Sequence, residues 1–171
     1  TLTSDLASPR NNIQCTVTAS ESDGGSVSSA ASVEVQNTLP MITITAPATD
    51  ALFNEGITVT FTASVSDGDE DSSGLNVHWT SSIDDDLGDG LTLSTTTLSA
   101  GVHTVTGTVR DSDEGTASDT VTLTINALPT APTVSISPSS PLTHQDLVAS
   151  ASGSTDPDGS GTVTYSYQWY E

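Results

Sequence analysis

The feature that most constrains this chain is the strict alternation of apolar and polar residues between positions 57 and 126. Apolar residues stand at every second position in three runs: Ile57, Val59, Phe61, Ala63 and Val65; Leu75, Val77 and Trp79; Val121, Leu123 and Ile125. A period of two turns one face of a β-strand toward a core and the other toward water. The stretch therefore predicts most of one β-sandwich domain.

Short, acidic, glycine-containing loops separate the alternating runs, and signals for helices are nearly absent. The strands we expect are Ile42–Ala46, Ile57–Val65, Leu75–Ile83, Leu91–Thr97, Val102–Arg110 and Ala117–Ile125. Turn signals at intervals of about ten residues, together with a central tryptophan, favour an immunoglobulin-like (Ig-like) sandwich. We read the segment 84–90 as an acidic loop, and Asp85 and Asp89 as turn residues.

The chain also contains an internal repeat of about ninety residues. The linkers Asn37–Pro40 and Asn126–Pro129 are nearly the same, and each follows an alternating strand. Those strands in turn follow the acidic turns Glu21–Gly25 and Asp111–Gly115. After the second linker, residues 163–169 repeat the strand that ends at Trp79, and periods of this length indicate a tandem array.

The predicted fold class is all-β, with tandem Ig-like β-sandwiches in which one complete central domain lies between two complementary half-domains. We expect residues 1–37 to be the C-terminal half of an Ig-like domain and residues 38–126 to be a complete domain. Residues 127–171 would be an N-terminal half, completed by the next copy or by sequence outside this segment.

The composition excludes some classes of partner. The 171 residues include 2 Lys+Arg and 22 Asp+Glu, giving a formal net charge of -20. Binding to nucleic acid or to an anionic membrane surface requires clustered basic residues, so neither is expected. No apolar run is long enough for membrane insertion.

The single cysteine, Cys15, excludes an intrachain disulfide, and its phase with Ile13 and Val17 predicts a buried thiol.

Carboxylates alternate in two loops that an Ig-like sandwich places at the end where the chain enters. Asp67, Asp69 and Asp71 lie in one loop, Asp111 and Asp113 lie in the other, and Asn37 stands just before the entry. Calcium takes six to eight oxygen ligands, and crowded carboxylates repel one another unless a cation lies among them. We therefore predict a Ca²⁺ site; the alternative is a set of solvated polar turns.

The next boundary repeats this pattern. Asn126, Asp156 and Asp158 would supply half of a second calcium site, and the missing loop would resemble Glu21 and Asp23. We therefore expect the C-terminal half-domain of one copy to pair with the N-terminal half of the next. The pairing would be covalent within a longer chain, or it would occur between copies by strand complementation. Head-to-tail association that does not close produces a filament.

No catalytic apparatus is evident, so we do not expect an enzyme. The carboxylates lie on loops where nothing indicates a closed pocket, and no Gly-x-Ser-x-Gly motif occurs. His103 lies in core phase near the start of a strand, which favours a structural role over metal binding. The phase of Trp79 and Trp169 points them toward a core, which argues against platforms for stacking sugars.

Three segments of the central domain carry a family resemblance: Val77–Gly90, Leu98–Thr106 and Arg110–Gly115. They are similar to the PKD-type and bacterial Ig-like domains of microbial surface proteins, and the flanking halves resemble another Ig-like type found in such arrays. Many PKD-type domains have an aspartate after the tryptophan, whereas Thr80 follows Trp79 here, so the match is to a looser variant. The predicted calcium sites are similar to those between cadherin-like domains.

The resemblance implies a β-sandwich with an extracellular or cell-surface location, and no enzymatic activity. From it we expect a structural protein: a calcium-stabilised Ig-like repeat unit of a filament or surface stalk, whose partners are copies of itself. The alternative is an adhesin, or a carbohydrate-binding accessory module of a secreted protein, with a glycan as partner. An exposed strip of aromatic side chains would favour this alternative.

Overall fold

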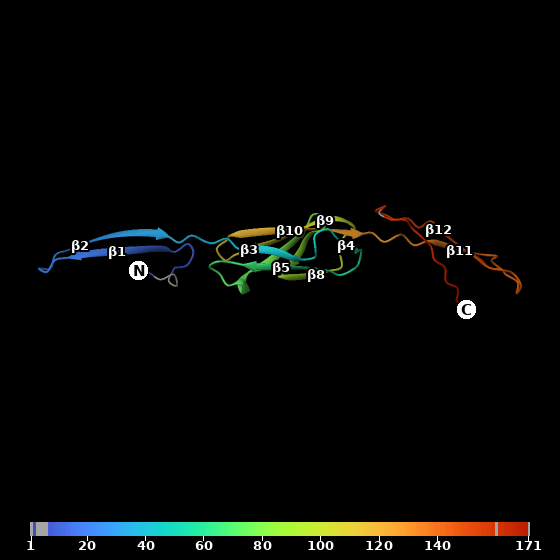
Figure 1. Ribbon diagram of the computed structural model, residues 1–171, viewed down its shortest axis with the longest axis horizontal. Coiled ribbons are helices and arrows are strands. Elements are labelled where there is room, and N and C mark those ends of the chain that lie inside the picture. Colours follow the sequence, from blue (N-terminus) through green and yellow to red (C-terminus); the bar gives the residue numbers. More distant parts are fainter. Residues whose placement is uncertain (1, 3–6, 160, 171) are drawn as a thin grey trace.

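The computed structural model of the protein describes all residues except 1, 3–6, 160 and 171. The parts of the two predicted half-domains that fall on these positions lie outside the described residues. Figure 1 shows three units in a row along one axis: a hairpin, a central sandwich and a shorter C-terminal unit. Of the described helices, none is both long enough and apolar enough to cross a membrane.

The central unit consists of two packed sheets. One sheet has the order β4-β10-β9-β6-β7 and the other the order β3-β5-β8. Their strands are β3 (Met41–Ala46), β4 (Ala51–Asn54), β5 (Val59–Ser66), β6 (Asn76–Ser81), β7 (Asp85–Asp89), β8 (Thr92–Thr95), β9 (Gly101–Arg110) and β10 (Thr116–Asn126). A short 3-10 turn, η2 (Ser72–Gly74), precedes β6.

The core of the sandwich is made of the alternating residues that the sequence pattern selects. Phe61 on β5 and Trp79 on β6 are fully buried, and their ring centroids lie 5.4 Å apart. Val105 and Val109 on β9 and Leu123 on β10 close the core from the other strands of the larger sheet. An all-β sandwich with period-two burial is thus confirmed for this part of the chain.

Two strands of the sandwich were missed by the sequence pattern. β4 pairs in parallel with β10, and β7 pairs with β6 although it was predicted to be a loop. β7 is rich in aspartate, so its composition resembles a turn, but it lies at a sheet edge with its aspartates exposed and Leu87 packed against the core. Two hydrogen bonds hold the end of this strand to β6: Trp79 Nε1 donates to the Gly90 carbonyl at 2.8 Å, and Gly90 N donates to the Val77 carbonyl at 2.8 Å.

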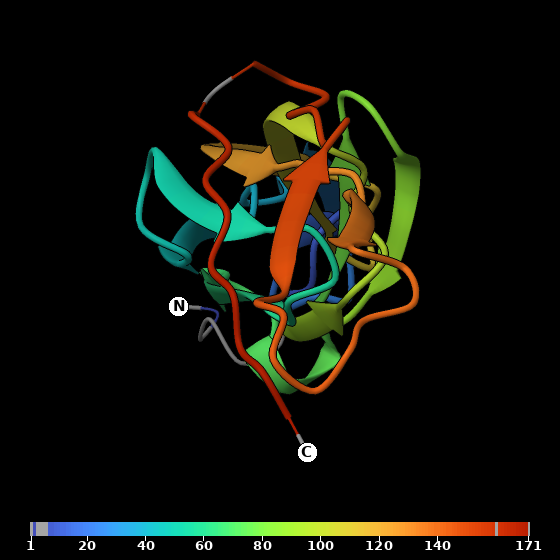
Figure 2. The same cartoon turned by 90° about the vertical axis from the view of Figure 1, so that its right-hand side faces the viewer.

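The flanking units are two-stranded sheets. β1 (Asn12–Ser20) pairs with β2 (Ser26–Glu34), and β11 (Thr133–Ser137) pairs with β12 (Val148–Ser152), both antiparallel. The segment 163–170, predicted to be a strand, is not one; Figure 2 shows it in red as a tube beside β12. Among the described residues, neither flanking unit is covered by a second sheet.

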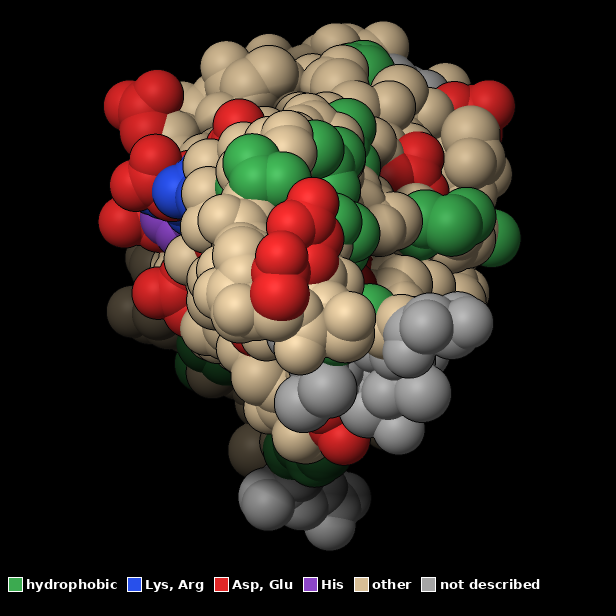
Figure 3. All heavy atoms as spheres, turned by 90° about the vertical axis from the view of Figure 1, so that its left-hand side faces the viewer, with side chains coloured by type: hydrophobic (Ala, Val, Ile, Leu, Met, Phe, Trp, Pro, Cys, Tyr) green, Lys and Arg blue, Asp and Glu red, His purple; other side chains and the backbone are tan. Residues whose placement is uncertain are grey.

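Two predictions about burial are wrong for this chain by itself. Cys15 is exposed, and the side chain of Trp169 is 50% exposed, although both have the phase of core residues. The physical reason is the same in both cases: alternation selects one face of a strand, but burial requires a second layer on that face. Seen end-on from the hairpin side, hydrophobic and acidic side chains both reach the surface (Figure 3).

Candidate functional site

The first junction is the place where the linker after β2 enters the central sandwich between two loops. Asn37 Nδ2 donates to Asp111 Oδ2 at 2.9 Å, and Thr38 N donates to Asp69 Oδ2 at 2.9 Å. The β5–β6 loop and the β9–β10 turn therefore both hold the linker. The structure brings Asn37, Asp69 and Asp111 together at this end, as their positions in an Ig-like sandwich require.

Asp67 lies at the start of the β5–β6 loop and organises it. Its Oδ1 accepts hydrogen bonds from Asp69 N at 2.9 Å and from Glu70 N at 3.2 Å, an arrangement typical of an Asx turn. Its other oxygen, Oδ2, is buried and has no hydrogen-bond partner among the described residues. A buried carboxylate oxygen without a partner is costly, so this atom is the one at the junction that most needs a ligand.

Asp111 is the buried carboxylate of the junction. Its Oδ1 accepts from Gly115 N at 2.7 Å, while its Oδ2 accepts from Asn37. The backbone closes the same turn, because Asp111 N donates to the Gly115 carbonyl at 3.0 Å. A Cβ added at Gly115 would lie 2.4 Å from Asp111 Oδ2 and 2.8 Å from Asn37 Nδ2, so only glycine fits here.

We expect Gly115→Ala to loosen the linker. The new methyl group would displace the Asp111 carboxylate or the Asn37 amide, at a cost of about 1–3 kcal/mol in the free energy of unfolding. Thermal unfolding and limited proteolysis at residues 36–40 measure the effect. The matched control is Gly25→Ala, where the added atom would meet only the ends of two flexible side chains, Glu21 Oε2 at 3.1 Å and Asp23 Oδ1 at 4.0 Å. Equal behaviour of the two variants would contradict the expectation.

The remaining predicted ligands of the first junction, Asp71 and Asp113, have partners of their own. Asp71 caps η2, accepting from Ser73 N at 2.8 Å, and the hydrogen bonds from Ser73 lower the pKa of Asp71. Asp113 lies 3.7 Å from Arg10 Nε in an ion pair, and Arg10 also donates to the Asp113 carbonyl oxygen. Asp71 thus stabilises its own loop, whereas Asp113 links the β9–β10 turn to Arg10 on the other side of the junction.

Glu70 is a junction residue that sequence reasoning missed. Its Oε2 accepts from Ser112 N at 3.0 Å and so ties the β5–β6 loop to the β9–β10 turn. The signal available in the sequence was its place within the acidic run 67–71. For Asp69, the backbone hydrogen bond from Thr38 is the main reason that its pKa is lowered. The Asp69 carboxylate is thus held in its charged form largely by a backbone N–H group.

The second junction repeats the geometry of the first. Ala127 N donates to Asp158 Oδ2 at 2.8 Å, as Thr38 N does to Asp69, and the two bonds lie one repeat apart. Asp156 Oδ2 accepts from Gly161 N at 2.7 Å, whereas its Oδ1 is buried without a hydrogen-bond partner, the second such carboxylate oxygen in the described part of the chain. Asn126 bonds to the Ala127 carbonyl at 3.0 Å.

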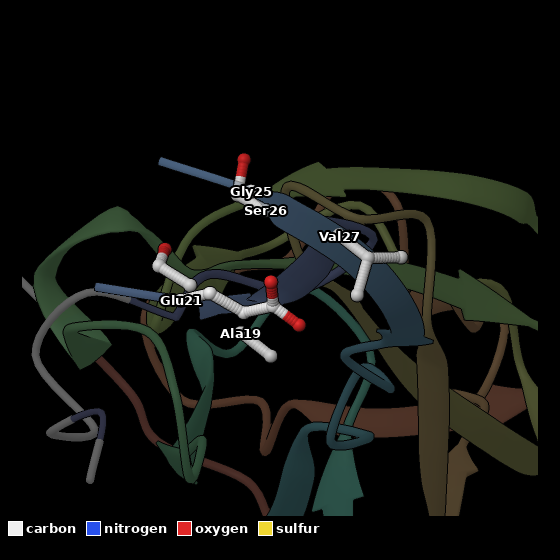
Figure 4. Close-up of a pocket in the computed structure, with 6 residues that line it drawn as sticks. Ala19, Glu21, Gly25, Ser26 and Val27 are labelled. Atoms are coloured by element: carbon white, nitrogen blue, oxygen red, sulfur yellow. The ribbon is translucent and has the colours of Figure 1, made fainter. Parts of the chain in front are cut away.

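Glu21 and Asp23 are not brought to either junction. They lie in the β1–β2 turn, at the end of the molecule far from the second junction (Figure 1). Figure 4 shows Glu21 at this turn with Ala19 and Val27 beside it. Within residues 2, 7–159 and 161–170, no three acidic, histidine or cysteine side chains are grouped closely enough to hold a metal ion.

A buried polar corner at the opposite end of the sandwich involves His103. Its ring is fully buried, with Nδ1 2.8 Å from Ser81 Oγ and Nε2 2.7 Å from the Ser99 carbonyl. Asp84 accepts from Ser99 N and Oγ at 3.0 and 2.6 Å. Burial acts to raise the pKa of Asp84, but the Ser99 bonds and His103 outweigh it, so the pKa is lowered. This corner gives His103 the structural role predicted for it.

The strand order and the paired sheets define the central unit as an Ig-like β-sandwich. Residues 42–125, from β3 to β10, match the family model described as PKD domain. This part of the chain is therefore similar to PKD domains, as its motifs indicated. PKD domains usually occur in extracellular proteins.

No curated protein matches the chain. Among solved structures, the fibronectin(III)-like modules of Clostridium thermocellum CbhA are similar at 19% sequence identity, with a TM-score of 0.49. That match covers 68% of this chain and 63% of the other, so the chain spans less than two thirds of its length.

Proposed function

We propose that this chain is an extracellular structural protein: a calcium-stabilised Ig-like repeat unit of a filament or surface stalk that assembles head-to-tail. We also propose that it has no enzymatic activity. The observation that carries the proposal is the recurrence of one junction. At both linkers, a backbone N–H donates to the second aspartate of the following Asp-x-Asp loop, at 2.9 and 2.8 Å.

A repeated junction of this kind suits a stalk, because it fixes each domain relative to its linker by hydrogen bonds as well as by chain connectivity. The net charge of -20 would drive domains apart, and this repulsion favours an extended array over a collapsed one. Arg10, one of the few bases, adds an ion pair with Asp113 across the first junction.

We propose Ca²⁺ as the ion that the two unpartnered carboxylate oxygens would coordinate. Asp67 Oδ2 and Asp156 Oδ1 are buried, lack hydrogen-bond partners among the described residues and occupy equivalent positions in the repeat. Asn37 and Asp111 would complete the first site. The acidic side chains as placed are not grouped as a ready ion cage, so binding would require them to converge. A bound cation would neutralise charge at the junction and stiffen the array.

Calcium should raise the stability of the protein. If it binds only the folded form, the gain is about 2.7 kcal/mol at a hundredfold excess over Kd. Calorimetric titration and thermal unfolding, with Ca²⁺ or with a chelator, measure it. Asp67→Asn and Asp156→Asn should each remove a share of the binding heat, whereas the exposed Asp146→Asn makes the same charge change and should remove none. Absence of heat and of any shift at millimolar Ca²⁺ would contradict the calcium proposal.

One observation favours the alternative, a recognition module that binds a glycan. Tyr165, Tyr167, Trp169 and Tyr170 are 38–89% exposed, and aromatic faces of this kind stack on sugars. Electron microscopy of the native material distinguishes the two proposals: regular head-to-tail particles support the filament, and single chains that bind a glycan array through these aromatics support recognition.

A further inference from the structure

We propose that the β1–β2 hairpin of one copy completes the C-terminal unit of a second copy, with β1 adding as an antiparallel strand to the segment 163–170. This inference rests on the proposed head-to-tail assembly and goes further, because it names the two surfaces and their register. In that register, Val17 of one copy lies opposite Trp169 of the other.

The first argument is the register of the hairpin. In β1–β2, Ile13 pairs with Val33, Cys15 with Ala31 and Ala19 with Val27. In β9–β10, the equivalent pairs are His103 with Leu123, Val105 with Val121 and Val109 with Ala117. Each pair in β9–β10 lies the same number of residues after its equivalent in β1–β2. The two turns also contain the same backbone hydrogen bond: Glu21 N donates to the Gly25 carbonyl, and Asp111 N donates to the Gly115 carbonyl. The hairpin is therefore the structural equivalent of β9–β10.

The second argument is what β9–β10 covers in the central sandwich. β9 pairs with β6, and its inward residues His103, Val105 and Val109 are fully buried. In the hairpin, the same face is open: Val17, Val27 and Val33 are 66%, 71% and 65% exposed. Among the described strands, only β2 pairs with β1, so the other edge of β1 offers free backbone groups.

The third argument is a matching surface at the other end of the chain. The segment 163–170 corresponds to β6, with Trp169 in the place of Trp79. It lines a hollow of about 260 Å³, together with apolar residues of β11 and β12: Val134, Ile136, Ala149 and Ala151. This segment lies beside β12 in Figure 2, and Ala151 N donates to Tyr167 Oη at 3.2 Å.

The fourth argument is the size of the side chains that would meet. In the central sandwich, Val77 is paired with Val109; the equivalents are Tyr167, which is larger, and Ala19, which is smaller. Volume is thus conserved across the pair, as a packed core requires.

The same compensation occurs around the tryptophan. Trp79 is paired with Gly107, where an added Cβ would lie 3.2 Å from the indole. The equivalent of Gly107 is the larger Val17, while the inward residues of β12, the strand in the place of β5, are alanines, which are smaller than the Phe61 that packs on Trp79. Where a side chain of one unit is larger than its equivalent in the central domain, the side chain facing it from the other unit is smaller. This is the relation expected if the hairpin and the C-terminal unit form two halves of one core.

The two surfaces differ and lie at opposite ends of the long axis (Figure 1). A contact between them is heterologous and extends from copy to copy. It would also carry the β1–β2 turn to the second junction, where Glu21 would stand beside Asn126 as Asp111 stands beside Asn37.

The register can be tested by cross-linking in the Cys15→Ser background. His78 pairs with Thr108, and the equivalents are Gln168 and Thr18, so their Cα atoms would lie within disulfide range. A mixture of Thr18→Cys and Gln168→Cys chains should form heterodimers under mild oxidation, on the order of tenfold more than a mixture of Ser28→Cys and Gln168→Cys chains. Ser28 is the matched control, because it lies opposite Thr18 on β2, away from the proposed contact edge.

A second measurement does not depend on cysteine chemistry. In sedimentation over a concentration series, Trp169→Ala should weaken self-association on the order of 100-fold, whereas Tyr170→Ala, on the outward face, should leave it unchanged. Association with no preference for the Thr18–Gln168 pair would overturn the register while leaving the filament proposal in place. A wild-type chain that is monomeric throughout would overturn the inference and mean that another occupant, such as a glycan or a further chain segment, covers the hollow. Calcium binding at the first junction lies within one chain and is tested independently.

Discussion

Replacing Trp79 with alanine should lower the free energy of unfolding of the central sandwich by about 3–5 kcal/mol. The side chain is fully buried and stacks at a tilt on Phe61, and its Nε1 donates to the Gly90 carbonyl at 2.8 Å. Its removal leaves a large cavity, loses that hydrogen bond and frees the end of β7 from β6. For a domain of this size, each kcal/mol lost from the free energy of unfolding lowers the melting temperature by about 4–8 °C. The melting temperature should therefore fall by at least about 12 °C.

The control is the other tryptophan of the chain. Trp169→Ala makes the same chemical change outside the central sandwich, at a side chain that is 50% exposed. In dilute solution it should leave the unfolding transition of the central domain unchanged, as followed by circular dichroism. A loss below about 1 kcal/mol in Trp79→Ala would mean that this tryptophan is not the centre of the core.

Replacing His103 with phenylalanine should cost about 2–5 kcal/mol, because two hydrogen bonds with buried or half-buried groups are lost. The ring is fully buried. Its Nδ1 forms a hydrogen bond with Ser81 Oγ, and its Nε2 forms one with the Ser99 carbonyl. Phenylalanine preserves most of the volume, so the measured loss reports the polar contacts. Urea unfolding at neutral pH gives the difference in free energy.

His78→Phe provides the comparison. His78 lies on the same sheet, but its side chain is 48% exposed, and its 2.9 Å contact with Asp89 is at the surface. Exposed ion pairs contribute about 0–1 kcal/mol, so this variant should stay close to the parent. Equal losses for the two variants would show that the His103 corner has no special role in holding the end of β9 to β6.

The sequence predicted where the first junction lies, but it predicted only some of the residues that form it. Alternating aspartates before and after the linker positions indicated that two loops meet where the chain enters, and Asn37, Asp69 and Asp111 do meet there. The partners of these carboxylates were not predictable, because they are backbone N–H groups whose direction depends on the loop conformation. Glu70 was missed for this reason. Asp71 was assigned to the junction although it bonds within its own loop, and Asp113 lies at the junction but pairs with Arg10.

By itself, the sequence determined the β-sandwich, the face of each long strand that carries core residues, and the repeat that relates the two linkers. These follow from local periodicity, which depends only on the geometry of an extended chain. The tertiary structure alone decided that β7 is a strand, that β4 runs parallel to β10, and that Cys15 and Trp169 are exposed. Pairing and burial are properties of neighbouring strands and covering sheets, which a one-dimensional pattern does not contain.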